Sequence, residues 1–176
     1  MPADTLPNWP AMSIAQANEL LAAEGSPLEI TDAVINGVDM KIYKNAPPTI
    51  PLILQLASVQ FGDRDFIVYE DERVTFDALA RAVIKLAGVM RETYGIEKGD
   101  RVGIIMRNYP QWPVAFFAAS MIGAIATPMN SWWTSEELEY GLSFAGVKLA
   151  FVDPQIFERI RAEWENLPEL KNVVIA

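Results

Sequence analysis

The chain has 176 residues, 51% of them hydrophobic and 21% charged, which is typical of a globular protein with a core rather than of a disordered chain. Its net charge of −9, with basic residues scattered along the chain, argues against nucleic-acid binding. Because cysteine and histidine are both absent, these residues can form no disulfide, thiolate nucleophile, Ser-His triad or histidine zinc site.

Residues 1–48 are expected to form an N-terminal arm. The first residues lack a basic region followed by an apolar core, so no secretory signal is predicted and a cytoplasmic location is expected. The capping-box pattern from Ser13 to Gln16, followed by Leu20, Leu21 and then Gly25, predicts a short helix. Residues 26–48 mix Pro, Gly, Asn and Asp with brief apolar patches, and predict an arm that wraps over a surface.

A second helix is predicted to begin near Pro51 and to end at Gly62. Its spacing favours Leu52, Leu56 and Val59 as the buried face.

Residues 66–69 and 73–76 flank the acidic turn at residues 70–72, and predict a β-hairpin. A long helix then starts at Thr75 or Asp77 and ends at Gly95. Its apolar positions repeat at spacings of three and four, as in Phe76, Leu79, Val83, Leu86, Met90 and Tyr94.

Four short apolar runs, at residues 102–106, 124–129, 149–152 and 173–176, alternate with three helical patterns. This order is β-α-β-α-β-α-β, and parallel strands need such helical crossovers. The sequence therefore predicts an α/β fold: a mostly parallel sheet with helices on both faces, preceded by the hairpin and the helical N-terminal arm.

Three helix starts are predicted within this alternation. Asn108 is expected to cap the first helix, the capping box from Thr134 to Glu137 the second, and Asp153 the third, with Pro154 at its first position. The third helix is expected to continue to Pro168, with its buried face formed by Ile156, Ile160, Trp164 and Leu167.

Residues 108–135 contain no charged residue, which raises the question of a membrane span. Pro110, Pro113 and Pro128 interrupt this stretch and Gly123 divides it, so it is better explained as a buried helix followed by a buried strand. No transmembrane segment is predicted.

The residues after the strands, Arg107 and Asn108, residues 130–133, and Asp153, are expected to meet at one edge of the sheet, where ligands bind in such folds. Helix capping and core packing explain the same residues without a ligand, and are the favoured interpretation. Trp132 and Trp133 are the candidate substrate-binding residues, with one ring expected to be packed and the other nearer a cleft. No Gly-x-Gly-x-x-Gly or Walker loop is present, so neither dinucleotide nor P-loop phosphate binding has a local signature. No catalytic, cofactor-binding or metal-binding residue is predicted.

Five segments occur in the order found in acyl-CoA synthetases: Val74-Thr-Phe-Asp-Ala-Leu79, Lys98-Gly-Asp-Arg-Val-Gly-Ile-Ile105, Arg107-Asn-Tyr-Pro-Gln-Trp112, Phe117-Ala-Ala-Ser-Met-Ile-Gly-Ala-Ile-Ala-Thr-Pro-Met-Asn130 and Glu136-Glu-Leu-Glu-Tyr140. Over roughly residues 50–176 the chain resembles the first subdomain of the adenylate-forming superfamily. Trp132-Trp133-Thr134 and Asn45-Ala-Pro-Pro48 resemble the bacterial fatty-acid CoA ligase group.

The resemblance implies that the full-length parent uses ATP, magnesium and coenzyme A to convert a fatty acid or other carboxylate into a CoA thioester through an acyl-adenylate. The family's phosphate loop, a Ser/Thr-Gly run ending in Pro-Lys-Gly, lies beyond these residues, as do its ribose aspartate and catalytic lysine. Residues 49–176 are therefore expected to be an incomplete N-terminal α/β subdomain, truncated before the phosphate loop, inactive alone and without tight cofactor binding.

The expected partner is the remainder of the parent enzyme, and a homo-oligomer is expected because a truncated subdomain would leave apolar surface exposed. The alternative is a stand-alone, non-catalytic α/β module that binds a partner or a small ligand.

Overall fold

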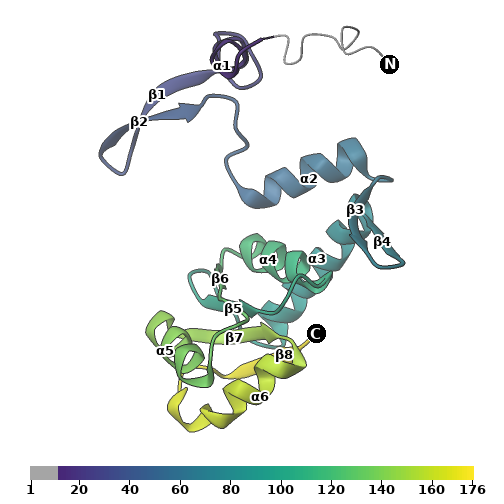
Figure 1. Ribbon diagram of the computed structural model, residues 1–176, viewed down its shortest axis with the longest axis vertical. Helices are drawn as coiled ribbons and strands as arrows, with labels where there is room; N and C mark the ends of the chain where they lie inside the picture. Colours follow the sequence, from purple (N-terminus) through teal and green to yellow (C-terminus); the bar gives the residue numbers. More distant parts are fainter. Residues whose placement is uncertain (1–11) are drawn as a thin grey trace, which may run out of the picture. The chain divides into compact units, whose positions relative to one another are not determined.

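The computed structural model describes residues 12–176, which form two compact units, one ending at Pro48 and the other starting at Thr49 (Figure 1).

The first unit consists of a helix and a β-hairpin. Helix α1 (Ile14–Leu21) begins with the predicted capping box, in which the backbone N–H of Gln16 donates to Ser13 Oγ over 3.2 Å. Strands β1 (Ile30–Ile35) and β2 (Val38–Tyr43) pair antiparallel, and form a hairpin within residues 26–48 that was not predicted from the sequence. The physical reason is the turn at Asn36 and Gly37, whose φ angles of 52° and 81° are those of a tight two-residue hairpin turn.

The second unit starts with helix α2 (Ile50–Phe61), which Thr49 caps by accepting from the backbone N–H of Leu52. Leu54 is its buried residue, whereas Leu56 and Val59 are 50% and 83% exposed, so the predicted buried face is wrong. Because α2 contains no charged residue and is apolar on all sides, its periodicity does not identify one face.

The predicted hairpin is confirmed as strands β3 (Asp65–Tyr69) and β4 (Glu72–Thr75). Thr75 then caps helix α3 (Phe76–Glu92), whose buried positions are Leu79, Val83, Ala87 and Met90. The sequence pattern therefore predicted both the start and the inner face of this helix.

The central sheet contains β5 (Arg101–Ile105), β6 (Ile125–Pro128), β7 (Val147–Val152) and β8 (Asn172–Ile175). All its pairs are parallel and its order is β6-β5-β7-β8. Helices α4 (Gln111–Met121), α5 (Ser135–Ala145) and α6 (Pro154–Ala162) connect successive strands. The predicted α/β fold with a parallel sheet is confirmed.

Helices cover both faces of the sheet (Figure 1), and each face has its own core. Ile104 and Phe151 point toward α3 and α4, whereas Ile105 and Val152 point toward α5 and α6. Successive side chains on a strand alternate between faces, so buried strands need apolar residues at every position. This explains the uninterrupted apolar runs in the sequence.

The predicted start of α4 and the predicted end of α6 are wrong. Helix α4 starts at Gln111 after Pro110, because the N–H of Tyr109 donates to the carbonyl of Arg107 (2.7 Å) and places Asn108 inside a turn rather than at the cap. Helix α6 ends at Ala162 and is followed by a 3-10 turn over Trp164–Asn166, which leaves Trp164 41% exposed. Among residues 12–176, no helix is long and apolar enough to cross a membrane.

Candidate functional site

The carboxyl edge of the parallel sheet is the candidate functional site. In the sheet, β6 lies on one side of β5 and β7 lies on the other. The helix that follows β5 and the helix that follows β7 cover opposite faces of the sheet. Ligands of open parallel sheets bind at such a switch point, beyond the carboxyl ends of the strands. Arg107 follows β5 here, and Asp153 follows β7 directly.

Asp153 is 2% exposed and both of its carboxylate oxygens have partners. Oδ1 accepts from the backbone N–H groups of Gln155 and Ile156, each over 3.0 Å, as the predicted cap of α6. Oδ2 lies 3.7 Å from Nε of Arg107. The negative charge is therefore stabilised by a helix N-terminus and by a cation from the neighbouring strand end.

Arg107 is half-exposed and is held in place by Tyr109. Its guanidinium carbon lies 5.2 Å from the centre of the Tyr109 ring, and Nη2 donates to the Tyr109 hydroxyl. Tyr109 in turn packs edge-on against Tyr69 of the hairpin, with ring centres 6.1 Å apart. The hairpin thus supports the side chain that contributes the positive charge at this edge.

A hollow of about 360 Å³ lies beside these residues. It is lined by Tyr69, Glu72, Tyr109, Pro110, Gln111, Pro154 and Ala176. The lining combines aromatic surface with one carboxylate and one amide. It can accommodate part of a ligand but brings together no nucleophile with a general base.

Trp132 and Trp133 follow β6 and differ in their surroundings. Trp133 packs against the core beneath α5, and its ring lies so close to Gly141 that a Cβ atom there would be 2.7 Å from the ring. Trp132 is 79% exposed. One ring is packed and the other is not, as adjacent residues require, but neither lines the hollow near Asp153. Their role in substrate binding stays a prediction.

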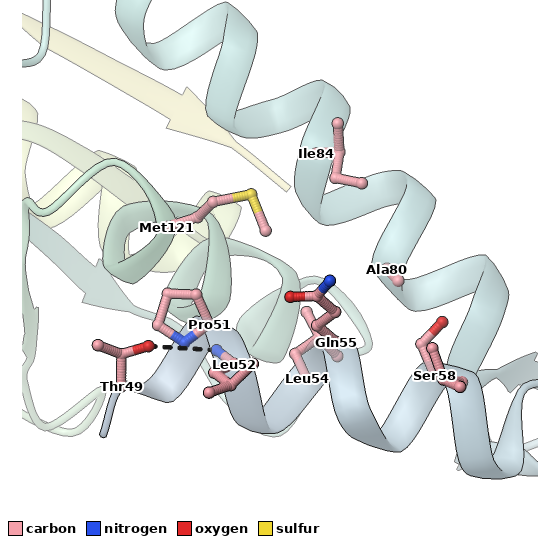
Figure 2. A pocket seen from close by; sticks show the side chains of 10 residues that line it. Thr49, Pro51, Leu52, Leu54, Gln55, Ser58, Ala80, Ile84 and Met121 are labelled. Atoms are coloured by element: carbon pink, nitrogen blue, oxygen red, sulfur yellow. Dashed lines mark hydrogen bonds between the residues drawn. The ribbon is translucent and has the colours of Figure 1, made fainter. Parts of the chain in front are cut away.

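A larger groove, of about 640 Å³, lies between α2, α3 and the end of α4 (Figure 2). Gln55 points into the space between the two long helices, and the walls include Leu54, Ile84 and Met121 (Figure 2). No lining residue is charged. The groove therefore lacks titratable groups for chemistry, and the smaller hollow at the sheet edge remains the candidate site.

The amino edge of the sheet holds a polar network that sequence reasoning did not single out. Lys148 Nζ lies 2.6 Å from Asp100 Oδ1, and the N–H of Glu97 donates to Asp100 Oδ2. The pKa of the Asp100 carboxyl is lowered from its ordinary value, mainly by the hydrogen bond from Lys148. Arg101 donates through Nε to the carbonyl of Ala145 at the end of α5 (2.8 Å). The signal was the Lys98-Gly-Asp-Arg segment, and its role here is structural.

The groups at the carboxyl edge do not by themselves fit ATP with magnesium. A triphosphate needs several free N–H or cationic donors, but the first N–H groups of α6 donate to Asp153, Pro154 has none, and Arg107 is paired. Among residues 12–176, no group of carboxylates is arranged to hold a metal ion. No step of a nucleotide reaction is therefore assigned to these residues.

Comparison with known proteins gives a consistent picture. A family model described as AMP-binding enzyme matches residues 54–176. An acyl-CoA ligase of Beauveria bassiana is 32% identical over 139 residues, which are 73% of this chain and 24% of that protein. A long-chain-fatty-acid–CoA ligase of Bacillus subtilis is 29% identical over 111 residues, or 63% of this chain and 20% of that protein. The chain thus spans about a quarter or less of the length of these relatives.

Solved structures agree with the fold. A fatty acyl CoA synthetase of Mycobacterium tuberculosis is 25% identical with a TM-score of 0.67, over 73% of this chain and 26% of that chain. An anthranilate CoA ligase in complex with anthranoyl-AMP has a TM-score of 0.71 at 22% identity, over 75% of this chain and 26% of that chain. The second likeness is evidence for the fold alone.

Proposed function

The chain belongs to the AMP-binding enzyme family, and from this premise we propose that it is the N-terminal part of an ATP-dependent carboxylate–CoA ligase that acts through an acyl-adenylate. The observation that carries the proposal is the match of the family model to the whole region from Leu54 to Ala176, which includes the parallel sheet and its helices. The relatives include acyl-CoA ligases, long-chain-fatty-acid–CoA ligases and a 4-coumarate–CoA ligase, and the recurrence of long-chain-fatty-acid–CoA ligases among them favours a fatty acid as the carboxylate.

In this proposal the chain provides the scaffold and one wall of the site, whereas the complete polypeptide supplies the groups that handle ATP, magnesium and coenzyme A. Adenylation depends on donors preorganised around the transferring phosphate. Arg107 lies at the carboxyl edge of the sheet and is already paired with Asp153. The chain alone is therefore proposed to be inactive, and the complete enzyme to work in the cytoplasm.

A chimera tests the proposal. Residues 54–176 would replace the matched segment of the Bacillus subtilis long-chain-fatty-acid–CoA ligase, and fatty-acid-dependent ATP–pyrophosphate exchange would be measured with octanoate, palmitate and benzoate. We expect exchange that depends on a fatty acid, and none from the 176-residue chain alone. The parent ligase is the positive control, and circular dichroism confirms folding. A folded chimera without exchange would contradict the proposal, and exchange by the chain alone would contradict its incompleteness.

A further inference from the structure

The outer face of α5 carries exposed aromatic rings. Tyr140 and Phe144 are 66% and 82% exposed, and their rings stack with centres 5.7 Å apart and an interplanar angle of 17°. Glu136 lies one turn before Tyr140 on the same face, and Glu137 lies beside it. We refer to Glu136, Glu137, Tyr140 and Phe144 as the α5 aromatic face.

The orientation of this face is determined by the opposite side of the helix. Leu138 and Leu142 are fully buried against the sheet, and Gly141 receives the ring of Trp133. The capping box at Thr134 and the left-handed Gly146 determine both ends of α5. Rotation of the helix to bury Tyr140 would expose two buried leucines, so the exposure of the aromatic rings is a property of the fold.

Exposed aromatic rings in a rigid arrangement are suited to an interface. Single exposed apolar side chains are ordinary, but Tyr and Phe contribute large contact areas and few rotatable bonds. The stack restricts both rings before a partner arrives, which lowers the entropy lost on binding. The α5 aromatic face is therefore preorganised to bind a flat or elongated partner.

The charge of α5 determines which partner fits. The helix contains Glu136, Glu137 and Glu139 and no lysine or arginine. The nearby Arg101 and Arg159 donate to backbone carbonyls, of Ala145 and Trp133 respectively. An isologous contact between two copies would place Glu136 near its own equivalent, and anionic lipid or nucleic acid would meet the same repulsion. An arginine-bearing partner instead pairs with the glutamates and stacks on the rings.

We propose that the α5 aromatic face is the docking surface for an arginine-bearing amphipathic helix supplied by another part of the same polypeptide. The source of that helix follows from the length of the relatives, of which this chain spans about a quarter or less, and in that respect the inference rests on the proposed function. The recognition chemistry itself depends only on the residues of α5.

The first arm of the test measures recognition with a synthetic amphipathic helical peptide of leucine and arginine, titrated calorimetrically into the 176-residue chain. We expect binding that weakens at high salt, and at least tenfold weaker binding (about 1.4 kcal/mol) by the Tyr140→Ala, Phe144→Ala double variant, since aromatic anchors dominate such interfaces. Val34→Ala, which truncates an exposed apolar side chain on β1, is the matched control and should leave affinity unchanged. A peptide with glutamate in place of arginine should not bind. Equal binding of both peptides, or unchanged affinity of the double variant, would overturn the proposal.

The second arm tests the source of the helix. The part of the Bacillus subtilis ligase that follows its matched segment, produced separately and shown to be folded, should compete with the arginine peptide. Failure to compete would contradict a source within the same polypeptide. A dimer that the double variant abolishes would instead identify a second copy as the occupant. Both arms measure binding rather than catalysis. Binding can therefore be absent while the chimeric ligase is active, and binding can be present while the chimera is inactive, so failure of this inference is distinguishable from failure of the proposed function.

Discussion

Arg107 Nε lies 3.7 Å from Asp153 Oδ2, and this ion pair joins the ends of the two neighbouring strands β5 and β7 at the switch point of the sheet. Asp153 is almost fully buried and also caps α6, so one carboxylate couples a helix start to the neighbouring strand end. The carboxyl edge of the sheet is thus stabilised by an ion pair between residues that are distant in sequence.

Replacement of Asp153 tests this coupling. Asp153→Ala removes the cap and leaves Arg107 unpaired, and should lower the free energy of unfolding by about 1–3 kcal/mol. Asp153→Asn retains a capping oxygen and should cost less. Urea denaturation measures both. Asp77→Ala, which removes the exposed pair of Asp77 with Arg81, is the control and should cost under about 1 kcal/mol. A loss no larger than the control would show that the buried pair has no special role.

Gly141 and Gly88 form a matched pair of helical glycines. A Cβ atom at Gly141 would lie 2.7 Å from the Trp133 ring, whereas at Gly88 of α3 nothing lies within 4 Å. Gly88→Ala should stabilise the protein by about 0.5–1 kcal/mol through helix propensity. Gly141→Ala should destabilise it by about 1–3 kcal/mol, because the ring has to move. Thermal unfolding of the two variants decides this, and stabilisation of both would mean that the ring shifts without cost.

Stability should fall with acidification partly through Asp100. Its pKa is lowered in the folded state, chiefly by the hydrogen bond from Lys148, so the unfolded chain binds the proton more readily. The stabilisation from Asp100 is fully present above its ordinary pKa of 3.8, and it is lost as the pH falls through the lower pKa of the folded state. Lys148→Met should therefore lose less stability than the wild type between about pH 6 and pH 3. Lys85→Met, at an exposed position of α3, is the control and should follow the wild type. Equal acid losses in all three proteins would exclude the pair as a cause.

Self-association is expected through α2. Ile53, Leu56 and Val59 are exposed on a helix without a single charge, and apolar surface of this kind promotes contact between copies. The net charge of −9 opposes association most at low salt. Light scattering after size exclusion should show a dimer or larger species at moderate salt, and a monomer for the Ile53→Lys, Val59→Lys variant. Gln155→Lys places a charge at an exposed position of α6 instead, and should not dissociate it. A wild-type monomer at both salt concentrations would refute the expectation.

Local signals in the sequence predicted the sheet and most helix starts. Thr75, Thr134 and Asp153 cap their helices as expected, because a capping side chain acts within three residues of its own position. The prediction that Asn108 caps a helix was wrong, because a turn and Pro110 lie between Asn108 and the start of α4. The β1–β2 hairpin could have been predicted from Asn36 and Gly37, the strongest short signal for a tight turn.

The candidate site was less predictable, because it depends on contacts between distant segments. The sequence placed Arg107 and Asp153 each at the end of a strand. They form an ion pair because β5 and β7 are neighbours in the sheet, and the order of strands in the sheet is not visible in the sequence. Similarly, the alternation of a strand requires one of Trp132 and Trp133 to face outward without identifying which. The contact between Trp133 and Gly141 answers that question, and only the folded chain shows it.

The coding sequence downstream of the Ala176 codon tests the central claim most directly. Sequencing of the genomic DNA through that position should show an open reading frame that continues into a run rich in glycine, serine and threonine, followed by Pro-Lys-Gly. This result would supply the phosphate-binding groups that the carboxyl edge near Asp153 does not offer. A stop codon directly after Ala176, with no such segment in frame, would contradict the account and favour a stand-alone, non-catalytic module.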